Sequence, residues 1–362
     1  MSFATRLEAA WYRPGLTPLT ALLTPLSALF ALAAETRAAL YRVGVLPTHR
    51  LPVPVVVIGN ITVGGSGKTP LTIALARVLA AAGFTPGVVS RGYGRADASG
   101  APSLVGPGST PDEVGDEPLL IARAGFPVAV AADRVAAGRA LLAAQPRCDV
   151  ILADDGLQHY RLGRDVEIAV VDTARGFGNG WRLPAGPLRE PRSRWTRCDA
   201  VVALVPRGAP AGGPKATGRA WQALMIVAHR MTLAGSVFRR LRPAGEGTER
   251  PAGADDADDV AVPDRFSGPG VHAVAGIGNP ARFFATLAAL GIDAEPHAFP
   301  DHHAFRPSDL DFAGATAILM TAKDAVKCER FATPAMWYLP VEATVDPALV
   351  ARIVEKLRGR RT

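Results

Sequence analysis

Cysteine is scarce in this chain, and its three copies lie far apart without a Cys-x-x-Cys pair. No disulfide framework or zinc site is implied, and a reducing compartment is the simpler interpretation. Aromatic residues make up only 6% of the sequence, and no basic-aromatic motif accompanies the net charge of +7. Nucleic acid is therefore not an expected partner.

Lysine is also rare, with five copies, so the positive charge comes almost entirely from arginine. Two interpretations remain open: a general composition bias, or a surface that faces anionic lipid or phosphate. The 48% hydrophobic content is typical of a folded protein. A length of 362 residues is enough for two domains of ordinary size.

A long, clean hydrophobic run is missing as well. Residues 16–34 form a stretch of nineteen without a charge, close to the minimum for a membrane span, but Pro18 and Pro25 interrupt it. Arginines flank it on both sides, and no signal-peptide cleavage site follows. We expect a helix that lies in the membrane interface. A buried or docking helix and a true span are the alternatives.

The most informative segment begins with the β-branched residues 55–58, which are typical of a strand covered on both faces. A glycine-rich turn follows, and Lys68 and Thr69 then open an amphipathic helical pattern. Backbone N–H groups, a lysine and a hydroxyl in this order can bind triphosphate and Mg²⁺. The usual first glycine is replaced by Thr62. The predicted nucleotide-binding residues are Thr62, Val63, Gly64, Gly65, Ser66, Gly67, Lys68 and Thr69.

Apolar runs alternate with helical patterns after this segment, which indicates an α/β fold with a parallel sheet and crossover helices. The predicted strands are 55–58, 87–90, 128–131, 150–152, 168–171 and 200–204. The predicted helices are 69–82, 117–123 and 133–144.

Composition suggests three parts. Residues 1–45 are the predicted membrane-associated helical segment, 46–219 the phosphate-binding-loop domain, and 220–362 a smaller α/β domain. Residues 206–214 read as a linker, and 243–269, with their prolines, glycines and acidic run, as a mobile surface insertion. A second strand–helix pattern covers residues 271–290.

Polar clusters follow several predicted strands, at the edge where open α/β sheets bind ligands. Asp154 and Asp155 end an apolar strand, as Mg²⁺-binding carboxylates do, although a helix cap is the alternative. Asp116 precedes a helix, where an N-cap would also explain it. Arg189 and Glu190 form a charged turn with no visible mechanism. Asp301, His302 and His303 place an acid beside two histidines, which alone favours solvation over catalysis.

Taken in order, these motifs resemble one family, the tetraacyldisaccharide 4′-kinases of Gram-negative bacteria. The resemblance covers nearly the whole chain, and the ordered set is far more specific than any single motif. Its anchors lie at residues 59–70, 90–95, 115–118, 154–159, 187–190, 276–280, 299–303 and 323–327.

The resemblance implies transfer of the ATP γ-phosphoryl group to the 4′-hydroxyl of an acylated glucosamine disaccharide 1-phosphate, which forms lipid IVA. It implies ATP and Mg²⁺ as cofactors, and peripheral attachment to the cytoplasmic face of the inner membrane through the N-terminal helix. No obligate protein partner follows from it. A cleft between a larger phosphate-binding-loop domain and a smaller α/β domain would hold the site.

The same resemblance implies roles for single residues. Thr69, Asp154 and Asp155 would lie at the metal, and Asp116 would accept the proton of the attacking hydroxyl. His302 would work with Asp116 from the other domain, so that closure of the cleft could assemble the site. Asp301, Glu190 and Arg189 complete the implied catalytic set.

Two departures and two rivals limit this interpretation. The family's usual Thr-Glu-Lys-Asp is Thr321-Ala322-Lys323-Asp324 here, so any role of that glutamate is in doubt, and the 243–269 segment has no counterpart. The main rival is a membrane-attached switch or metal-insertion NTPase. Such ATPases commonly carry lysine before the paired glycines, where this chain has Val63, and no Asn-Lys-x-Asp supports GTP. A non-enzymatic lipid-surface binding module with a vestigial nucleotide site is a further alternative, against which the intact Lys68, Thr69, Asp154 and Asp155 argue.

Overall fold

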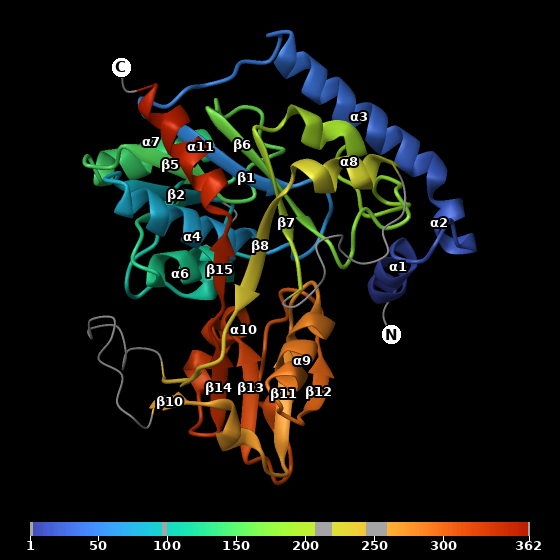
Figure 1. Ribbon diagram of the computed structural model, residues 1–362, viewed down its shortest axis with the longest axis vertical. Coiled ribbons are helices and arrows are strands. Elements are labelled where there is room, and N and C mark those ends of the chain that lie inside the picture. Colours follow the sequence, from blue (N-terminus) through green and yellow to red (C-terminus); the bar gives the residue numbers. More distant parts are fainter. Residues whose placement is uncertain (1–2, 96–99, 207–218, 244–258, 361–362) are drawn as a thin grey trace.

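The computed structural model describes residues 3–95, 100–206, 219–243 and 259–360. Within these ranges the chain forms two sheets, stacked along the long axis of the molecule (Figure 1). The predicted linker at 206–214 lies almost wholly outside the described residues, as does the 244–258 part of the predicted insertion.

The larger sheet has nine strands in the order β15-β8-β7-β6-β1-β5-β2-β4-β3. The strands from β8 to β4 pair in parallel, and only the two edge strands β15 and β3 are antiparallel to their neighbours. The predicted parallel α/β fold is therefore confirmed. The strands are β1 Val55–Asn60, β2 Pro86–Ser90, β3 Ser103–Leu104, β4 Val128–Val130, β5 Val150–Ala153, β6 Val166–Asp172, β7 Ala200–Leu204, β8 His229–Ala234 and β15 Glu342–Val345.

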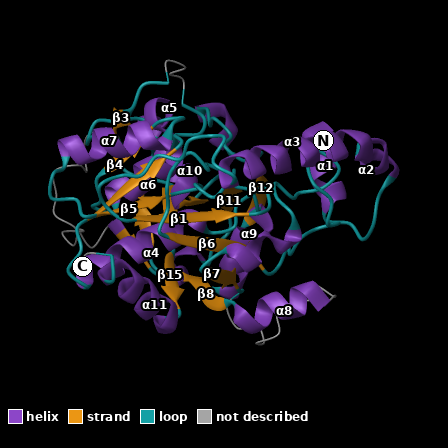
Figure 2. Cartoon of the chain, turned by 90° about the horizontal axis from the view of Figure 1, so that it is seen from above, coloured by secondary structure: helices purple, strands orange, loops and turns teal. Residues whose placement is uncertain are grey.

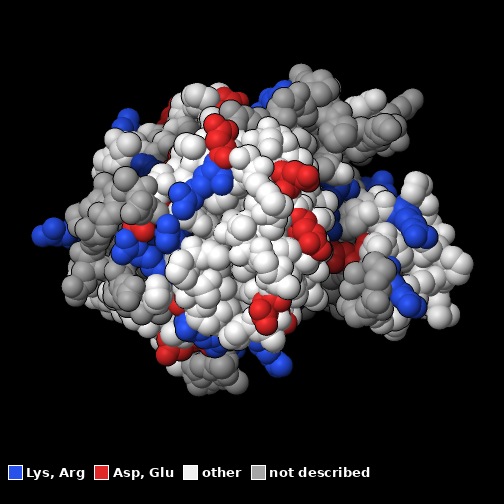
Figure 3. Space-filling view, turned by 90° about the horizontal axis from the view of Figure 1, so that it is seen from below, with Lys and Arg blue, Asp and Glu red and all other residues white. Residues whose placement is uncertain are grey.

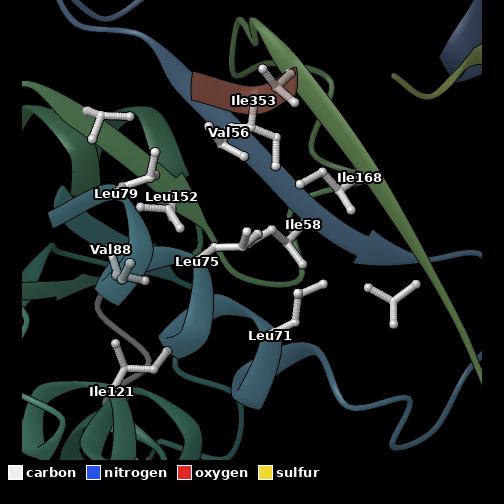
Figure 4. Packing of buried hydrophobic residues seen from close by; sticks show 14 of the residues in the cluster. Val56, Ile58, Leu71, Leu75, Leu79, Val88, Ile121, Leu152, Ile168 and Ile353 are labelled. Atoms are coloured by element: carbon white, nitrogen blue, oxygen red, sulfur yellow. The ribbon is translucent and has the colours of Figure 1, made fainter. Parts of the chain in front are cut away.

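Helices cover both faces of this sheet, which is why its strands read as continuous apolar runs. On β1, Val56 and Ile58 face one core, whereas Val55 and Val57 face the other. Figure 4 shows the first core, where Leu75 of α4 and Ile353 of α11 pack over Ile58 and Val56. The helices are α4 Lys68–Ala81, α5 Pro111–Val114, α6 Asp116–Arg123, α7 Arg134–Ala144, α8 Arg219–Val227 and α11 Pro347–Arg358, with a 3₁₀ turn η1 at Arg192–Arg197.

The smaller sheet has six strands in the order β10-β9-β14-β13-β11-β12. Strands β14, β13, β11 and β12 are parallel, and β9 and β10 close one side in antiparallel pairs. The elements are β9 Phe238–Arg240, β10 Val260–Ala261, β11 Val271–Ala275, β12 Glu295–Ala298, β13 Ala317–Thr321, β14 Met336–Leu339, α9 Pro280–Ala289 and α10 Ala322–Cys328, with 3₁₀ turns at Pro263–Phe266, Pro307–Leu310 and Glu329–Phe331.

The topology differs from the predicted domain boundary at residue 220. Strands β8 and β15 both belong to the larger sheet, and α11 packs on its core, so the chain leaves this sheet after β8 and returns at β15. The two crossing segments run side by side, since a Cβ on Gly235 would lie 2.3 Å from the Pro340 carbonyl oxygen. Sequence order alone could not reveal this return, because β15 is a short edge strand with an alternating pattern.

The predicted mobile insertion also differs from the structure at its C-terminal end. Residues 260–261 form β10, and Phe266 is buried against Phe238 and Trp337 at ring distances of 4.8 and 5.7 Å. Because this segment is rich in proline and glycine, its sequence did not indicate that Phe266 belongs to the core of the smaller sheet.

Three N-terminal helices lie to one side of the larger sheet (Figures 1 and 2): α1 Phe3–Trp11, α2 Pro18–Leu22 and α3 Thr24–Arg42. Pro18 and Pro25 both stand in first turns, where proline is tolerated, so the prolines divide the uncharged stretch instead of kinking one helix. Across the described residues, every helix is too short or too polar to traverse a bilayer.

On the face at the end of the smaller sheet, basic and acidic side chains do not form separate patches (Figure 3). Figure 3 shows basic and acidic side chains there among wide uncharged areas. This face therefore gives no support to the interpretation of the net charge as a basic binding surface.

Candidate functional site

The predicted phosphate-binding loop joins β1 to α4, in the middle of the larger sheet. Gly64 and Gly67 adopt φ values of 98° and 82°, a region that side chains avoid, so these two glycines are needed for the turn. Gly67 is the N-cap of α4, and Lys68 is its first residue. Lys68 Nζ donates to Asn60 Oδ1 (3.2 Å), while Asn60 Nδ2 donates to the Gly64 carbonyl (3.3 Å). Asn60, which follows the strand's apolar run, thus positions both the lysine and the loop.

The first part of the loop is held by the segment that precedes Arg189 and Glu190. The Val63 N–H donates to the Pro187 carbonyl (2.8 Å), and Thr62 forms a bridge with Leu188. Thr62 therefore takes the place of the usual glycine at a point where the chain is extended and paired. The Ser66 hydroxyl is buried and has no hydrogen-bond partner in the part of the chain that the structure describes.

Asp154 follows β5, the strand beside β1, and is completely buried. Thr72 Oγ1 donates to its Oδ1 (3.0 Å), and Thr69 Oγ1 lies 3.4 Å from its Oδ2. Burial, reinforced by the charge of Glu117, raises the pKa of Asp154 to about 7. A carboxylate beside a threonine hydroxyl is a donor set that Mg²⁺ prefers, and a cation would favour the ionised form of Asp154.

Asp155 is in a different electrostatic environment although it is the next residue. Both of its oxygens lie 3.1 Å from Arg189 Nη1, and Oδ1 lies 3.6 Å from Lys68 Nζ. Burial acts to raise the pKa of Asp155, but Lys68 and Arg189 outweigh it and hold the pKa below its ordinary value. Its φ of 49° is unusual for a residue with a side chain. This backbone conformation directs Asp155 toward Arg189 and Lys68, whereas the adjacent Asp154 contacts threonine hydroxyls.

Glu190 is buried in a network away from solvent. Its carboxylate accepts from Gln158 Nε2 (2.8 Å), Tyr160 Oη (2.5 Å) and Arg194 Nε (3.0 Å). With these donors engaged, Glu190 fixes the turn that carries Arg189. These contacts fix the position of Glu190, and the catalytic role expected from the sequence stays a prediction.

Asp116 and His302 come from different sheets and meet in the structure. Asp116 is the first residue of α6, capped by Gly115, so the N-cap alternative for Asp116 is wrong. His302 Nδ1 lies 3.2 Å from Asp116 Oδ2. Burial acts to raise the pKa of Asp116, but contact with His302 and the charges of Lys323 and Lys327 lower it to about 2. The two groups are therefore in contact in this structure, and the expected closure of the cleft stays a prediction.

His302 and Asp155 are the two non-glycine residues with positive φ in the described ranges, and His302 has a φ of 59°. Such conformations cost free energy and persist where the surroundings impose them, often at functional sites. Asp301 lies beside His302, and its Oδ1 accepts from Lys323 Nζ (3.3 Å). His303 points elsewhere and pairs with Asp309 (3.0 Å).

Lys323 is a site residue to which the sequence interpretation gave no role. Its Nζ lies 3.1 Å from Glu117 Oε1, 3.3 Å from Asp301 Oδ1 and 3.3 Å from His302 Nε2. Burial opposes its charge, but the surrounding carboxylates raise the pKa of Lys323 above its ordinary value. Its signal was the 323–327 motif itself, whose spacing puts Lys323 and Lys327 one helical turn apart on α10.

The neighbouring Asp324 explains another part of that motif. It is fully buried, and its Oδ2 accepts from the Gly276 N–H (3.0 Å) and Thr321 Oγ1 (2.7 Å). It thereby fixes the loop at 276–280 that faces the phosphate-binding loop. A Cβ on Gly278 would lie 2.5 Å from the Gly65 nitrogen, and Arg282 Nη2 donates to the Gly65 carbonyl (3.2 Å). Arg282 was another residue that sequence reasoning missed.

The loop from Val63 to Thr69 lines one cleft of about 2680 Å³ between the two sheets, together with Asp155, Arg189, His302 and Lys323. Asp154 and Asp116 are buried beside this lining, in contact with Thr69 and His302. The cleft extends from the phosphate-binding loop to α3, where Phe30, Arg37 and Tyr41 form part of its wall. It can therefore hold a nucleotide beside an acceptor that reaches the N-terminal helices.

Comparisons with known proteins agree with this geometry. Residues 19–358 match the family described as tetraacyldisaccharide-1-P 4′-kinase. The chain is 52% identical to the tetraacyldisaccharide 4′-kinase of Aromatoleum aromaticum over 94% of this chain and 95% of the relative. It is 50% identical to that of Chromobacterium violaceum over 98% of both chains.

Among solved structures, the chain resembles the "apo" form of LpxK from Aquifex aeolicus in complex with ATP. The TM-score is 0.69 at 28% identity, over 94% of this chain and 99% of the other. Relatives of this identity and coverage, the family match and the shared fold lead to one conclusion: the chain belongs to the tetraacyldisaccharide 4′-kinase family.

Proposed function

We propose that this protein transfers the γ-phosphoryl group of ATP to the 4′-hydroxyl of tetraacyldisaccharide 1-phosphate, which forms lipid IVA. The observation that carries the proposal is the 3.2 Å contact between the buried Asp116 and His302, which lines the same cleft as the phosphate-binding loop. A switch or metal-insertion NTPase does not need an acid–imidazole pair beside the nucleotide. The family match also favours the kinase.

The nucleotide's phosphates would lie against the loop from Gly64 to Thr69. Lys68 stands at the start of α4, where its ammonium and the helix N-terminus both favour anionic oxygens. Lys68 also lies close to Asp155, so its charge is held in place before the nucleotide arrives. This preorganisation lowers the cost of stabilising charge that develops on the transferred group.

Thr69, Asp154 and Asp155 would hold Mg²⁺. The fit rests on the buried Asp154 carboxylate beside the Thr69 hydroxyl, and on the Ser66 hydroxyl in the same loop, which has no hydrogen-bond partner among the described residues. When bound, the ion neutralises phosphate charge. Arg189 would keep Asp155 in its ionised, metal-binding form.

Asp116 would accept the hydrogen bond of the attacking hydroxyl. A pKa of about 2 makes this carboxylate alone a weak proton acceptor. As the oxygen–phosphorus bond forms, the hydroxyl proton would pass to Asp116, while His302, whose Nδ1 lies 3.2 Å from Oδ2, would orient the carboxylate. Lys323 would fix His302 and Asp301 and balance the negative charge of the cluster.

The acylated substrate would enter from a membrane surface at α2 and α3. Leu26 and Leu29 of α3 are three residues apart and are 54% and 63% exposed, and Leu22 at the end of α2 is 78% exposed. An apolar stripe of this kind, next to the cleft wall formed by α3, supports a helix lying on the cytoplasmic face of the inner membrane. A docking helix for a protein partner is the alternative outcome of the test below.

The direct test is a transfer assay with γ-labelled ATP, Mg²⁺ and detergent-dispersed tetraacyldisaccharide 1-phosphate, with parallel reactions that lack lipid or contain GTP. We expect label in a lipid product only with the disaccharide and ATP. If phosphate is released without lipid and no lipid becomes labelled, the kinase proposal is wrong and the NTPase alternative is supported. Co-sedimentation with anionic vesicles tests the membrane surface separately.

A further inference from the structure

Two histidines and a glutamate meet at the edge of the smaller sheet, away from the cleft. His272 lies on β11, and Glu295 and His297 lie on the parallel edge strand β12. His272 is paired in register with Glu295, and His297 is two residues further on, so all three can point to one face. In Figure 1 both strands lie at the outer side of this sheet.

The three side chains converge on a small volume. His272 Nδ1 lies 3.0 Å from His297 Nε2 and 3.4 Å from Glu295 Oε2, and His297 Nε2 lies 4.0 Å from Glu295 Oε1. One ligand atom from each residue lies within 4.8 Å of the others. Zinc–nitrogen and zinc–oxygen bonds of about 2.0–2.2 Å in a tetrahedron put ligand atoms roughly 3.3 Å apart.

We propose that His272, Glu295 and His297 bind one transition-metal ion of the Zn²⁺ class. Two imidazole nitrogens and a carboxylate oxygen are a ligand set that Zn²⁺ accepts, with a fourth position left for water. The Glu295 side chain is 67% exposed, so that position can be reached from solvent. The site lies outside the phosphoryl-transfer machinery.

The surroundings hold the two imidazoles in place. The Phe312 ring stacks on His272 at 4.4 Å and on His297 at 4.1 Å, with interplanar angles of 16° and 22°. Packing of this kind fixes ring orientation, as a ligand set requires. Burial also lowers the pKa of His297, which favours the neutral imidazole that a metal binds.

A bound ion would join the edge strand β12 to β11. Strand β12 runs into the turn that carries Asp301 and His302, and the Phe299 N–H at its end donates to the Ala275 carbonyl of β11 (2.9 Å). The ion would therefore stabilise the strand pair from which this turn emerges. We therefore expect the ion to raise the stability of the fold and to leave the rate of phosphoryl transfer unchanged.

The test uses the full-length protein without a histidine tag, stripped with EDTA and titrated with Zn²⁺ against a chelating dye, with Co²⁺ absorption as a second probe. We expect one ion per chain and a rise in the unfolding temperature. Loss of second-shell partners alone costs about 10–100-fold in affinity. Glu295→Gln and His297→Ala should therefore weaken binding by at least that factor.

His229→Gln is the matched control. His229 also contacts a carboxylate, that of Asp346, at 2.8 Å, but this pair supplies only two ligand groups. It should bind Zn²⁺ as the unaltered protein does. The exposed Glu295→Gln keeps the proposal testable if His297→Ala fails to fold. Less than one ion bound by the unaltered protein, or equal binding by Glu295→Gln and the unaltered protein, would overturn the proposal.

Discussion

The two sheets contribute to the cleft in different ways. The larger sheet presents Lys68 and Asp154 where β1 and β5 end, and both side chains are buried and hydrogen-bonded. The smaller sheet presents Asp301 and His302 from a turn, with side chains that are 30% and 24% exposed. The nucleotide half is thus built into a core, whereas the acceptor half depends on how the two sheets pack.

That packing is concentrated where α6 and α10 meet. Val326 of α10 joins the core of the larger sheet, and Lys323 and Lys327 both approach Asp116 at 3.8 Å. Arg123 and Glu329 form an ion pair beside them. An acid that belongs to one sheet therefore has its pKa set by residues of the other.

The largest expected effect comes from a substitution in the nucleotide-binding part of the cleft, which belongs to the larger sheet. Lys68→Ala removes the ammonium that faces Asp155 and the phosphates, and kcat should fall by at least about 10²–10³-fold. Transfer of label from γ-labelled ATP measures it, and circular dichroism checks folding.

Lys356→Ala, which breaks a surface pair with Asp199, is the control and should leave transfer unchanged. If Lys68→Ala keeps more than a tenth of the activity, the loop does not stabilise the transferred group.

The next effect tests whether the two sheets act as one unit. Asp116→Asn and His302→Gln should each lower kcat by about 10²–10⁴-fold, with ATP affinity retained. Because the residues work as a pair, the double variant should be little worse than the more damaged single variant.

Initial rates at saturating ATP and lipid give kcat for each variant, and calorimetry gives its affinity for ATP. Fully additive losses would mean that Asp116 and His302 act independently.

A smaller effect concerns the free energy of unfolding. The pKa of Asp116 falls from 3.8 to about 2 on folding, which corresponds to about 2 kcal/mol of stabilisation. The folded pKa is the lower one, so this stabilisation is complete above about pH 5 and is lost as the pH falls through 2. The stability gap between the unaltered protein and Asp116→Asn should therefore narrow from pH 5 to pH 2 in urea unfolding. A stability gap that stays constant over this pH range would contradict the lowered pKa of Asp116 in the folded protein.

The smallest effect compares α3 with a similar apolar surface elsewhere. Leu26→Ser with Leu29→Ser removes part of the exposed stripe and should raise the lipid KM about tenfold, with ATP affinity unchanged. Val262→Ser alters a valine that directly follows β10 and is 57% exposed, and should change neither the lipid KM nor the ATP affinity. Equal vesicle binding by both variants would move the membrane contact away from α3.

Much of the larger sheet could be predicted from the sequence. The predicted strands at 55–58, 150–152 and 200–204 correspond to β1, β5 and β7 within two residues, because strands covered on both faces leave continuous apolar runs. Residues 229–234 and 342–345 could not be placed, since β8 and the edge strand β15 are only partly buried and carry a weaker pattern.

The site divides in the same way. The sequence by itself determined the phosphate-binding loop and the acids after β5, because glycine conformation and strand ends impose them locally. Only the tertiary structure decided that Glu190 accepts from Gln158 and Tyr160, that Lys323 faces His302, and that Asp116 has a low pKa. These properties arise from contacts between residues far apart in the chain, and no local pattern records such a contact.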